Sequence, residues 1–255
     1  MADDTPDGAS STTTRDAFLG GRIEIHQPAD GYRAGGDPVF LAAAIAARPG
    51  AEVLDLGCGV GTASLCLLAR LPEIAVTGLE LQPELAALAA ANAAANGLAE
   101  RFAVLAGGLL TPPEILLGRR FDHVMTNPPW LEAASNQRPR TASKSTGHLE
   151  SDAAGLAVWL RQAVKFLKRK GTLTVIHRAD RLGDLLAVLA TLPVGGVRIL
   201  PLWPRRGQPA IRVVVTARKE VRSPAELLPG LVLHEDDGRF TTAAEDILRR
   251  AVALG

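Results

Sequence analysis

The feature that most constrains the fold is a regular alternation, from Gly50 onward, of short apolar runs with longer segments of helical period. Buried strands are indicated by AEVLDLG, IAVTGLEL, RFAVLAG, RRFDHVMTN and TLTVIHR, and helices by TASLCLLARL, PELAALAAANAAAN, SDAAGLAVWLRQAVKFLKRK and ADRLGDLLAVLATL. Strands that are separated by helices form parallel βαβ units. The alternation therefore predicts an α/β protein with a doubly wound sheet and helices on both faces.

The last two apolar runs have a different character. GVRILPLWP and AIRVVVTARK follow one another through a short polar link that contains Gly and Pro, with no helix between them. Two strands joined in this way pair as an antiparallel hairpin at a sheet edge. Together with the five runs above, they predict a seven-stranded sheet that is mostly parallel.

Upstream of the alternation, residues 20–49 predict a short hairpin followed by a helix that ends before Pro49. The first residues, MADDTPDGASSTTTRD, are polar and acidic, and we expect a disordered leader over residues 1–17. No repeat or linker interrupts the remaining chain. Residues 18–255 are therefore expected to form a single domain, with the hairpin and helix as an N-terminal extension.

The composition excludes several classes of function. The chain has 255 residues, and its 28 Lys and Arg against 27 Asp and Glu give a formal net charge of +1. This small charge creates no global field for a nucleic acid or a membrane, so any basic surface must be local. No apolar run approaches the roughly 18 residues of a membrane span. Cys58 and Cys66 have no second pair or His cluster beside them, so we expect no metal site and a cytoplasmic, reducing location.

Three glycines follow the first predicted strand of the alternation, in the segment VLDLGCGVGTAS. Gly57, Gly59 and Gly61 permit positive φ and a close approach of the backbone to a ligand. Asp55 precedes this loop and would attract a cationic amino-acid group, while Glu80 ends the next strand, where ribose-binding acids lie in such folds. Structural alternatives are a helix-capping role for Asp55 and a solvated strand end for Glu80. The two acids around a glycine loop favour a cofactor with a ribose and a positive charge.

The stretch DLGCGVG resembles the first motif of the class I S-adenosylmethionine-dependent methyltransferases, which implies a Rossmann-like sheet. The resemblance implies that the glycine loop contacts the methionine part of S-adenosylmethionine, and that Glu80, with Leu81 beside it, holds the ribose. Members of that family usually carry an acid after the third strand for the adenine amine. The matching place here is AGGLL, so backbone groups of Gly108 and Leu109 are expected to serve instead.

The run FDHVMT must end at Asn127-Pro128-Pro129-Trp130, because consecutive prolines offer no backbone donor to a sheet. A conjugated amine is a poor nucleophile, and two acceptors must hold its N–H groups so that its lone pair points at the methyl group. We expect the Asn127 side-chain oxygen and the Pro128 carbonyl to be these acceptors, Pro128 and Pro129 to fix their geometry, and Trp130 to stack on the substrate ring. Asn127 is also expected to border the cofactor. The alternative is a proline turn with Trp130 packed in the core.

NPPW resembles the Asp/Asn/Ser-Pro-Pro-aromatic motif of methyltransferases that act on adenine N6, cytosine N4, guanine N2 or a glutamine side chain. The upstream segment GYRAGGDPVFLAAA is similar to that of the bacterial family related to tRNA1(Val) adenine-37 N6-methyltransferase, and the resemblance spans roughly residues 20–219. It implies that Gly36 and Asp37 border the methionine end of the cofactor, with Tyr32 and Arg33 near the mouth of the site. The alternative, which is compatible with this role, is that Asp37 and Pro38 are the N-cap and first turn of a helix that runs through Ala47.

A basic segment follows NPPW. LEAASNQRPRTASKSTGH carries Arg138, Arg140 and Lys144 among small polar residues. We interpret it as a lid or a clamp on an RNA backbone, with a solvated loop as the alternative. Three arginines of the C-terminal hairpin would extend the same basic strip: Arg205, Arg206 and Arg212.

The sequence thus predicts an S-adenosylmethionine-dependent N-methyltransferase that acts on an exocyclic amine of RNA, with adenine N6 in tRNA as the leading substrate. One alternative is glutamine N5-methylation of a protein of the release-factor type, although such enzymes carry a helical N-terminal domain that a short leader cannot provide. Another is a non-catalytic platform that uses the cofactor fold to bind RNA or protein. The presence of Asp55, Glu80 and Asn127 argues against that platform.

Overall fold

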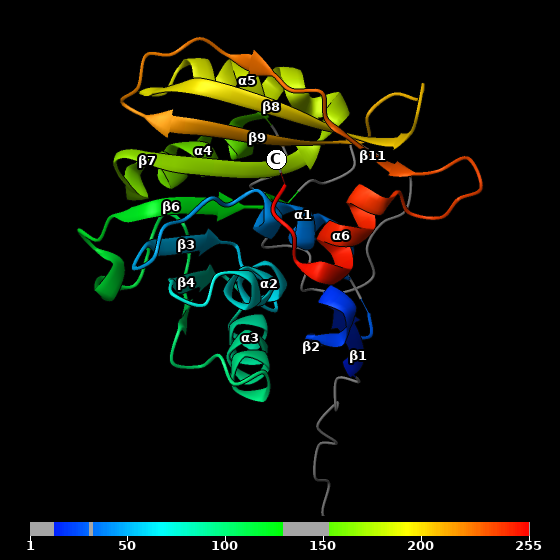
Figure 1. Ribbon diagram of the computed structural model, residues 1–255. Helices are drawn as coiled ribbons and strands as arrows, with labels where there is room; N and C mark the ends of the chain where they lie inside the picture. The colour runs from blue at the N-terminus through cyan, green and yellow to red at the C-terminus, as the bar shows by residue number, and fades with distance from the viewer. Residues whose placement is uncertain (1–12, 31–32, 130–152, 255) are drawn as a thin grey trace, which may run out of the picture.

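The computed structural model describes residues 13–30, 33–129 and 153–254. Within these ranges a nine-stranded sheet runs in the order β10-β8-β9-β7-β6-β3-β4-β5, and β11 also pairs with β8 (Figure 1). The strands of this sheet are β3 Glu52–Leu56, β4 Ala75–Glu80, β5 Phe102–Ala106, β6 Phe121–Thr126, β7 Leu167–Arg178, β8 Val194–Arg205, β9 Arg212–Lys219, β10 Glu226–Leu227 and β11 Leu231–His234.

The pairing confirms a mostly parallel sheet with an antiparallel C-terminal hairpin. Strands β3 to β7 pair in parallel, and β9 pairs antiparallel with both β7 and β8. The seven expected strands are β3 to β9. The structure adds β10 and β11 to these seven, as short parallel partners of β8; β11 and α6 (Thr242–Arg250) match the small strand, turn and helix that the C-terminal segment LPGLVLHEDDGRFTTAAEDILRR resembles, whereas β10 has only two residues and was not predicted.

Helices cover both faces of the sheet, as expected for a doubly wound fold. One face carries α1 Asp37–Ala43, α2 Thr62–Arg70, α3 Pro83–Ala95 and α6 Thr242–Arg250. The other face carries α4 Ala153–Phe166 and α5 Leu182–Ala190, which lie side by side (Figure 1). Each face thus has its own buried apolar cluster, which explains why the strands are apolar throughout rather than alternating. Short 3-10 turns complete the chain: η1 Leu19–Gly21, η2 Glu114–Leu116 and η5 Ala179–Arg181. None of the described helices combines the length and apolar content of a membrane span.

The N-terminal hairpin begins earlier than expected. Strand β1 (Thr13–Phe18) pairs antiparallel with β2 (Ile23–Pro28), so residues 13–17 are not part of a disordered leader. The side chains of β1 alternate between exposed and half-buried, whereas every second residue of β2 is buried. A polar strand of this kind is held by backbone pairing with an apolar partner, which a leader composition does not reveal.

Two helix ends also differ from the prediction. Helix α1 ends at Ala43 rather than just before Pro49, because Arg70 Nη2 donates to the carbonyls of Ala42 and Ile45 and the Leu254 N–H donates to the Ala43 carbonyl. These partners satisfy the carbonyls that a longer helix would have used. The segment LKRK was expected to end the helix of α4. It instead forms the first residues of β7, next to the place where the pairing register of β7 with β6 shifts between Phe121 and His123.

The topology brings two loops together at the carboxyl ends of two neighbouring strands. Strand β3 pairs with β4 on one side and with β6 on the other, so the strand order reverses between β3 and β6. Ligands of open α/β sheets bind outside the carboxyl ends of the strands at such a reversal. The segments that meet there are the glycine loop after β3 and the Asn-Pro-Pro turn after β6.

Candidate active site

The glycine loop is packed tightly at one glycine and open at another. Gly57, with φ +75°, could not carry a Cβ, because that atom would lie 2.8 Å from Cζ2 of Trp159. Gly59, with φ +55°, has no atom within 4 Å of the corresponding position. The backbone N–H groups of Gly57 and Cys58 both donate to the Leu79 carbonyl, at 2.8 and 3.2 Å. The loop is therefore anchored to β4 and presents open backbone at Gly59, as contact with a ligand requires.

Glu80 joins the glycine loop to the segment after β4. Its carboxylate accepts from the Gly59 N–H at 2.9 Å and from the Gln82 N–H at 3.0 Å. The residue is 7% exposed, so the alternative of a solvated strand end is wrong. A carboxylate has about four acceptor positions, and two backbone donors leave room for ribose hydroxyls.

Asp55 is buried beneath the same loop. Its carboxylate accepts from Ser64 Oγ at 2.7 Å, in the first turn of α2. Burial, opposed by the hydrogen bonds from Ser64 and assisted by the nearby charge of Glu80, raises the pKa of Asp55 to about 7. A cation beside this carboxylate would stabilise its ionised form. The contact with Ser64 is also what a helix-capping acid would make, so the two interpretations are compatible.

The segment after β5 folds over the end of β4. The Gly107 N–H donates to the Glu80 carbonyl at 2.8 Å, and a Cβ on Gly108 would lie 3.5 Å from Cδ1 of Leu81. Leu81 itself is 45% exposed, and Leu109 is half-buried. The structure thus brings Leu81, Gly108 and Leu109 to the same edge as Glu80, with exposed apolar surface beside backbone groups.

The Asn-Pro-Pro turn follows β6 at the strand reversal. Asn127 is half-buried, Pro128 is buried and Pro129 is exposed. Strand β6 lies next to β3, so this turn is the neighbour of the glycine loop in the sheet. Five further residues with predicted roles lie outside the described residues: Tyr32, Trp130, Arg138, Arg140 and Lys144.

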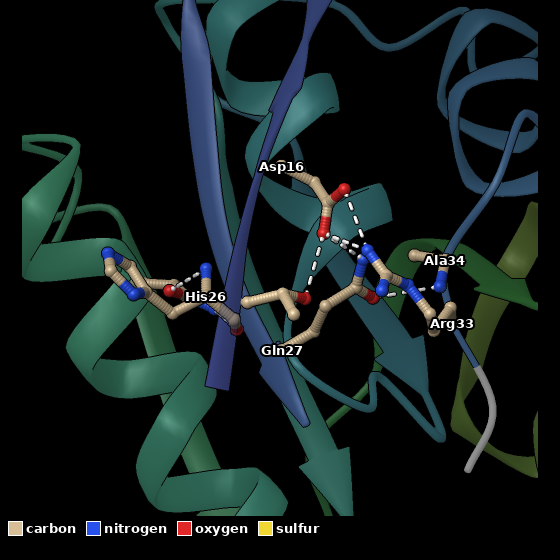
Figure 2. A network of polar contacts seen from close by, with 7 residues as sticks. Asp16, His26, Gln27, Arg33 and Ala34 are labelled. Atoms are coloured by element: carbon tan, nitrogen blue, oxygen red, sulfur yellow. Dashed lines mark hydrogen bonds and ion pairs between the residues drawn. The ribbon is translucent and has the colours of Figure 1, made fainter. Parts of the chain in front are cut away.

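Arg33 and the residue after it are held by the N-terminal hairpin (Figure 2). Arg33 Nη2 donates to both carboxylate oxygens of Asp16, at 2.8 and 2.7 Å. Gln27 is 1% exposed; its Nε2 donates to Asp16 at 2.7 Å and its Oε1 accepts from the Ala34 N–H at 2.9 Å. The predicted position of Arg33 near the mouth of the cofactor site therefore depends on the hairpin.

Asp37 lies at the same edge of the sheet and has a partner of its own. Its carboxylate accepts from Arg212 Nε at 2.8 Å, and Arg212 pairs in register with Arg178 at the end of β7. Gly36 is the N-cap of α1, so Asp37 belongs to the first turn rather than to the cap. An acid in that position interacts favourably with the helix dipole. A helix thus starts at this segment as expected, but the expectation that Asp37 is its N-cap is wrong, because Gly36 takes that position.

A groove of about 710 Å³ opens on the hairpin side of Gly36 and Asp37. None of the glycine-loop residues lines it, although Gly36 and Asp37 do. Its apolar lining comes from the hairpin, α1, β11, α6 and the segment between β11 and α6, and includes Phe18, Val39, Phe40, Leu233, Phe240 and Leu248.

Neither cysteine marks a reactive or metal-binding centre. Cys58 and Cys66 are free and buried, and burial raises the pKa of the Cys66 thiol to about 12. Within the described ranges, no group of three or more His, Cys, Asp and Glu side chains could hold a metal ion.

Sequence reasoning missed three polar side chains that organise the site. Asn92 of α3 joins the hairpin to the glycine loop, and Thr126 and Trp159 join the loop to the turn after β6. The only signal for Asn92 is an amide within an alanine-rich helix. Thr126 and Trp159 match the pattern of an apolar strand and an amphipathic helix, so nothing in the sequence distinguishes them from core residues.

A glycine loop after the first parallel strand, an acid after the second and an Asn-Pro-Pro turn across the strand reversal define a Rossmann-like methyltransferase. The sequence model of the methyltransferase small domain family matches residues 37–186, more than half of the chain. The chain belongs to this family and is an S-adenosylmethionine-dependent methyltransferase.

Curated relatives and a solved structure agree with this class. A tRNA1(Val) (adenine(37)-N6)-methyltransferase of Porphyromonas gingivalis is 34% identical over 69% of this chain and 70% of that protein. The protein of the same name from Yersinia enterocolitica is 31% identical over 74% of each chain. A crystal structure of a predicted O-methyltransferase from Agrobacterium tumefaciens has a TM-score of 0.69 and 25% identity, covering 86% of this chain and 98% of that one.

Proposed function

We propose that this enzyme transfers the methyl group of S-adenosylmethionine to an exocyclic amine of RNA, and that the amine is adenine N6 in a tRNA. The observation that carries the proposal is the position of Asn127 and Pro128, directly after β6 and beside the glycine loop. An amide oxygen and a backbone carbonyl at that place can accept both N–H groups of a planar amine, which orients its lone pair toward the methyl donor.

The choice of tRNA is supported by the relatives, which are named for adenine-37 N6-methylation of tRNA1(Val). In this proposal Trp130 stacks on the adenine, and Arg138, Arg140 and Lys144 contact the RNA backbone. A tRNA substrate is compatible with the cytoplasmic location and the absence of a membrane partner expected from the sequence.

The proposed cofactor contacts follow from the geometry at the glycine loop. Glu80 accepts from the ribose hydroxyls, because it is buried with free acceptor positions at open backbone. Asp55 faces the cationic end of the cofactor beneath Gly57 and Gly59. Backbone groups of Gly108 and Leu109 hold the adenine next to Leu81.

Radiolabelled S-adenosylmethionine should be supplied with unmodified tRNA, ribosomal RNA and a glutamine-containing release-factor peptide, followed by nucleoside mass spectrometry. We expect N6-methyladenosine in tRNA alone. Asn127→Ala should lower kcat by about a hundredfold or more, because one of two orienting acceptors is lost. Calorimetry should show that this variant still binds S-adenosylmethionine, with a loss of affinity much smaller than the loss in kcat, which separates a catalytic defect from misfolding.

Three outcomes would contradict the proposal. Label in the peptide would assign the enzyme to glutamine methylation, and label in guanosine would assign it to a different RNA amine. Full activity of Asn127→Ala would remove the role given to the turn. Asn127→Asp is a useful comparison because it retains an acceptor oxygen, and it should keep more activity than Asn127→Ala.

A further inference from the structure

A threonine and a tryptophan connect the two motifs of the active site at their bases. Thr126 is the last residue of β6 and is fully buried. Its hydroxyl donates to the Leu56 carbonyl at 2.7 Å and accepts from Trp159 Nε1 at 2.8 Å. A threonine hydroxyl has one donor and two acceptor positions, so both bonds are made by the same oxygen without conflict.

These bonds lie where the sheet itself stops connecting the two strands. The backbone register between β3 and β6 ends at the pair Asp55 and Met125. The bond from Thr126 to Leu56 is one residue further along, at the strand reversal. Leu56 immediately precedes the glycine loop and Thr126 immediately precedes Asn127. The hydroxyl therefore links the peptide that begins the cofactor loop to the peptide that begins the acceptor turn.

Trp159 adds a second link between the same two segments. It comes from α4, is 7% exposed, and donates to Thr126 while its ring lies against Gly57. A Cβ at Gly57 would be 2.8 and 2.9 Å from Cζ2 and Cη2 of the ring. The indole of Trp159 thus holds the glycine loop in place through its ring, and the end of β6 through its N–H.

We propose that Thr126 and Trp159 are positioning residues that set the separation between the methyl donor and the acceptor amine. The inference rests on the proposed function, because it assigns the acceptor amine to the turn at Asn127. Methyl transfer is an in-line displacement, and a misplacement of about 1 Å can lower its rate about a hundredfold. Neither side chain needs to touch the cofactor or the substrate for this role.

Thr126→Val tests the role, since valine keeps the shape and removes the hydroxyl. We expect kcat to fall by at least about tenfold while the Kd for S-adenosylmethionine changes less than about threefold, because the donor loop stays intact and only its alignment is lost. Thr126→Ser keeps the hydroxyl, so its kcat should be close to that of the wild-type enzyme. The matched control is Thr174→Val: Thr174 is fully buried on the adjacent β7, opposite Met125, and its hydroxyl makes no hydrogen bond in the described structure.

A double variant separates positioning from stability. Thr126→Val leaves the Trp159 N–H buried without an acceptor, which should lower Tm. Adding Trp159→Phe removes that donor, so Tm should rise again while kcat stays low. Recovery of kcat together with Tm would show a purely structural role and overturn the inference. So would equal kcat values for Thr126→Val and Thr174→Val.

Amide hydrogen exchange keeps this test independent of the substrate. Thr126→Val should speed exchange in the glycine loop and at the end of β6, and Thr174→Val should not. If the wild-type enzyme methylates none of the RNAs, the proposed function fails, and the exchange result still decides the link between the two segments. Unchanged exchange in Thr126→Val would overturn the inference even for an active enzyme.

Discussion

Asn92 of α3 donates from Nδ2 to the Val60 carbonyl in the glycine loop, at 3.0 Å, across 32 residues of sequence. The same amide pairs with both backbone groups of His26 in β2, at 2.9 Å each. One turn later, Asn96 pairs with both backbone groups of Glu24, at 2.9 and 2.7 Å. The side-chain amides of Asn92 and Asn96 thus form hydrogen bonds with the backbone of β2, as a neighbouring strand would. Asn92 in addition connects β2 to the glycine loop.

Asn92→Leu should destabilise the fold and loosen the glycine loop. Asn92 is 1% exposed, and its loss leaves backbone groups of the half-buried residues His26 and Val60 without these partners. At about 1 kcal/mol for each net bond, we expect the free energy of unfolding to fall by about 2–4 kcal/mol in urea denaturation. Asn96→Leu is the control, since Asn96 is half-buried and does not reach the loop. If both variants lost the same affinity for S-adenosylmethionine, the contact between Asn92 and the glycine loop would have no specific effect on cofactor binding.

Asp16→Ala should release the segment that precedes α1. Asp16 is the acceptor for both Arg33 and Gln27, and its bond with Gln27 helps to hold its pKa below the ordinary value. Without the carboxylate, Arg33 loses its ion pair and Gln27 loses one of its two contacts. Trypsin should then cut faster after Arg33, which mass spectrometry of the fragments would detect.

The same hairpin provides a control for the proteolysis experiment. Arg15 and Glu24 form an ion pair between the two strands, with exposed fractions of 63% and 45%. Exposed ion pairs contribute little, so Glu24→Ala should leave the cleavage rate after Arg33 unchanged. Faster cleavage in both variants would mean that the whole hairpin had loosened, and would exclude a specific role for Asp16.

Glu80→Gln should weaken both cofactor binding and the fold. The amide can offer only one acceptor oxygen, so either the Gly59 or the Gln82 N–H faces an NH₂ group. We expect a loss of about 1–3 kcal/mol in unfolding free energy and a Kd for S-adenosylmethionine raised by at least about tenfold, since hydrogen bonds to a charged group are the stronger ones. Calorimetry measures the Kd. An unchanged Kd would remove Glu80 from the cofactor site.

The parts of the fold that the sequence predicted are those with a repeating local signal. Strand β6 had to end at Asn127 because Pro128 has no donor, and α3 had to begin near Pro83 for the same reason. The parallel order then placed the two motifs at one edge. Local rules were sufficient for these features.

The features that sequence reasoning missed depend on partners far along the chain. The end of α1 at Ala43 is decided by Arg70 and Leu254, and the bond between Thr126 and Trp159 joins two elements that each match a simple apolar pattern. Strand β1 is polar and forms because β2 pairs with it. No short window of sequence contains both partners of the first two contacts, whereas β1 lies close to β2 along the chain and was missed because its composition is polar.

Asp55 should make both stability and cofactor binding depend on pH. Its pKa is raised, chiefly by burial, to about 7 in the folded protein, against an ordinary value of 3.8. Between these two values the folded state holds a proton that the unfolded chain has released, so stability falls as the pH rises through this window. Asp55→Asn keeps an acceptor for Ser64 and never ionises. This variant should therefore lose that part of the pH dependence in urea denaturation.

The cofactor should reverse the effect, because its positive charge favours the ionised carboxylate. Binding of S-adenosylmethionine should release a proton from Asp55, so affinity should rise between about pH 5.5 and 7.5, where an α-amino group with a pKa near 8 stays charged. Calorimetry in two buffers of different ionisation enthalpy would detect the released proton. Asp55→Asn should bind more weakly and show no such slope. The same pH slope in wild type and variant would mean that another group titrates, and that Asp55 acts only on the first turn of α2.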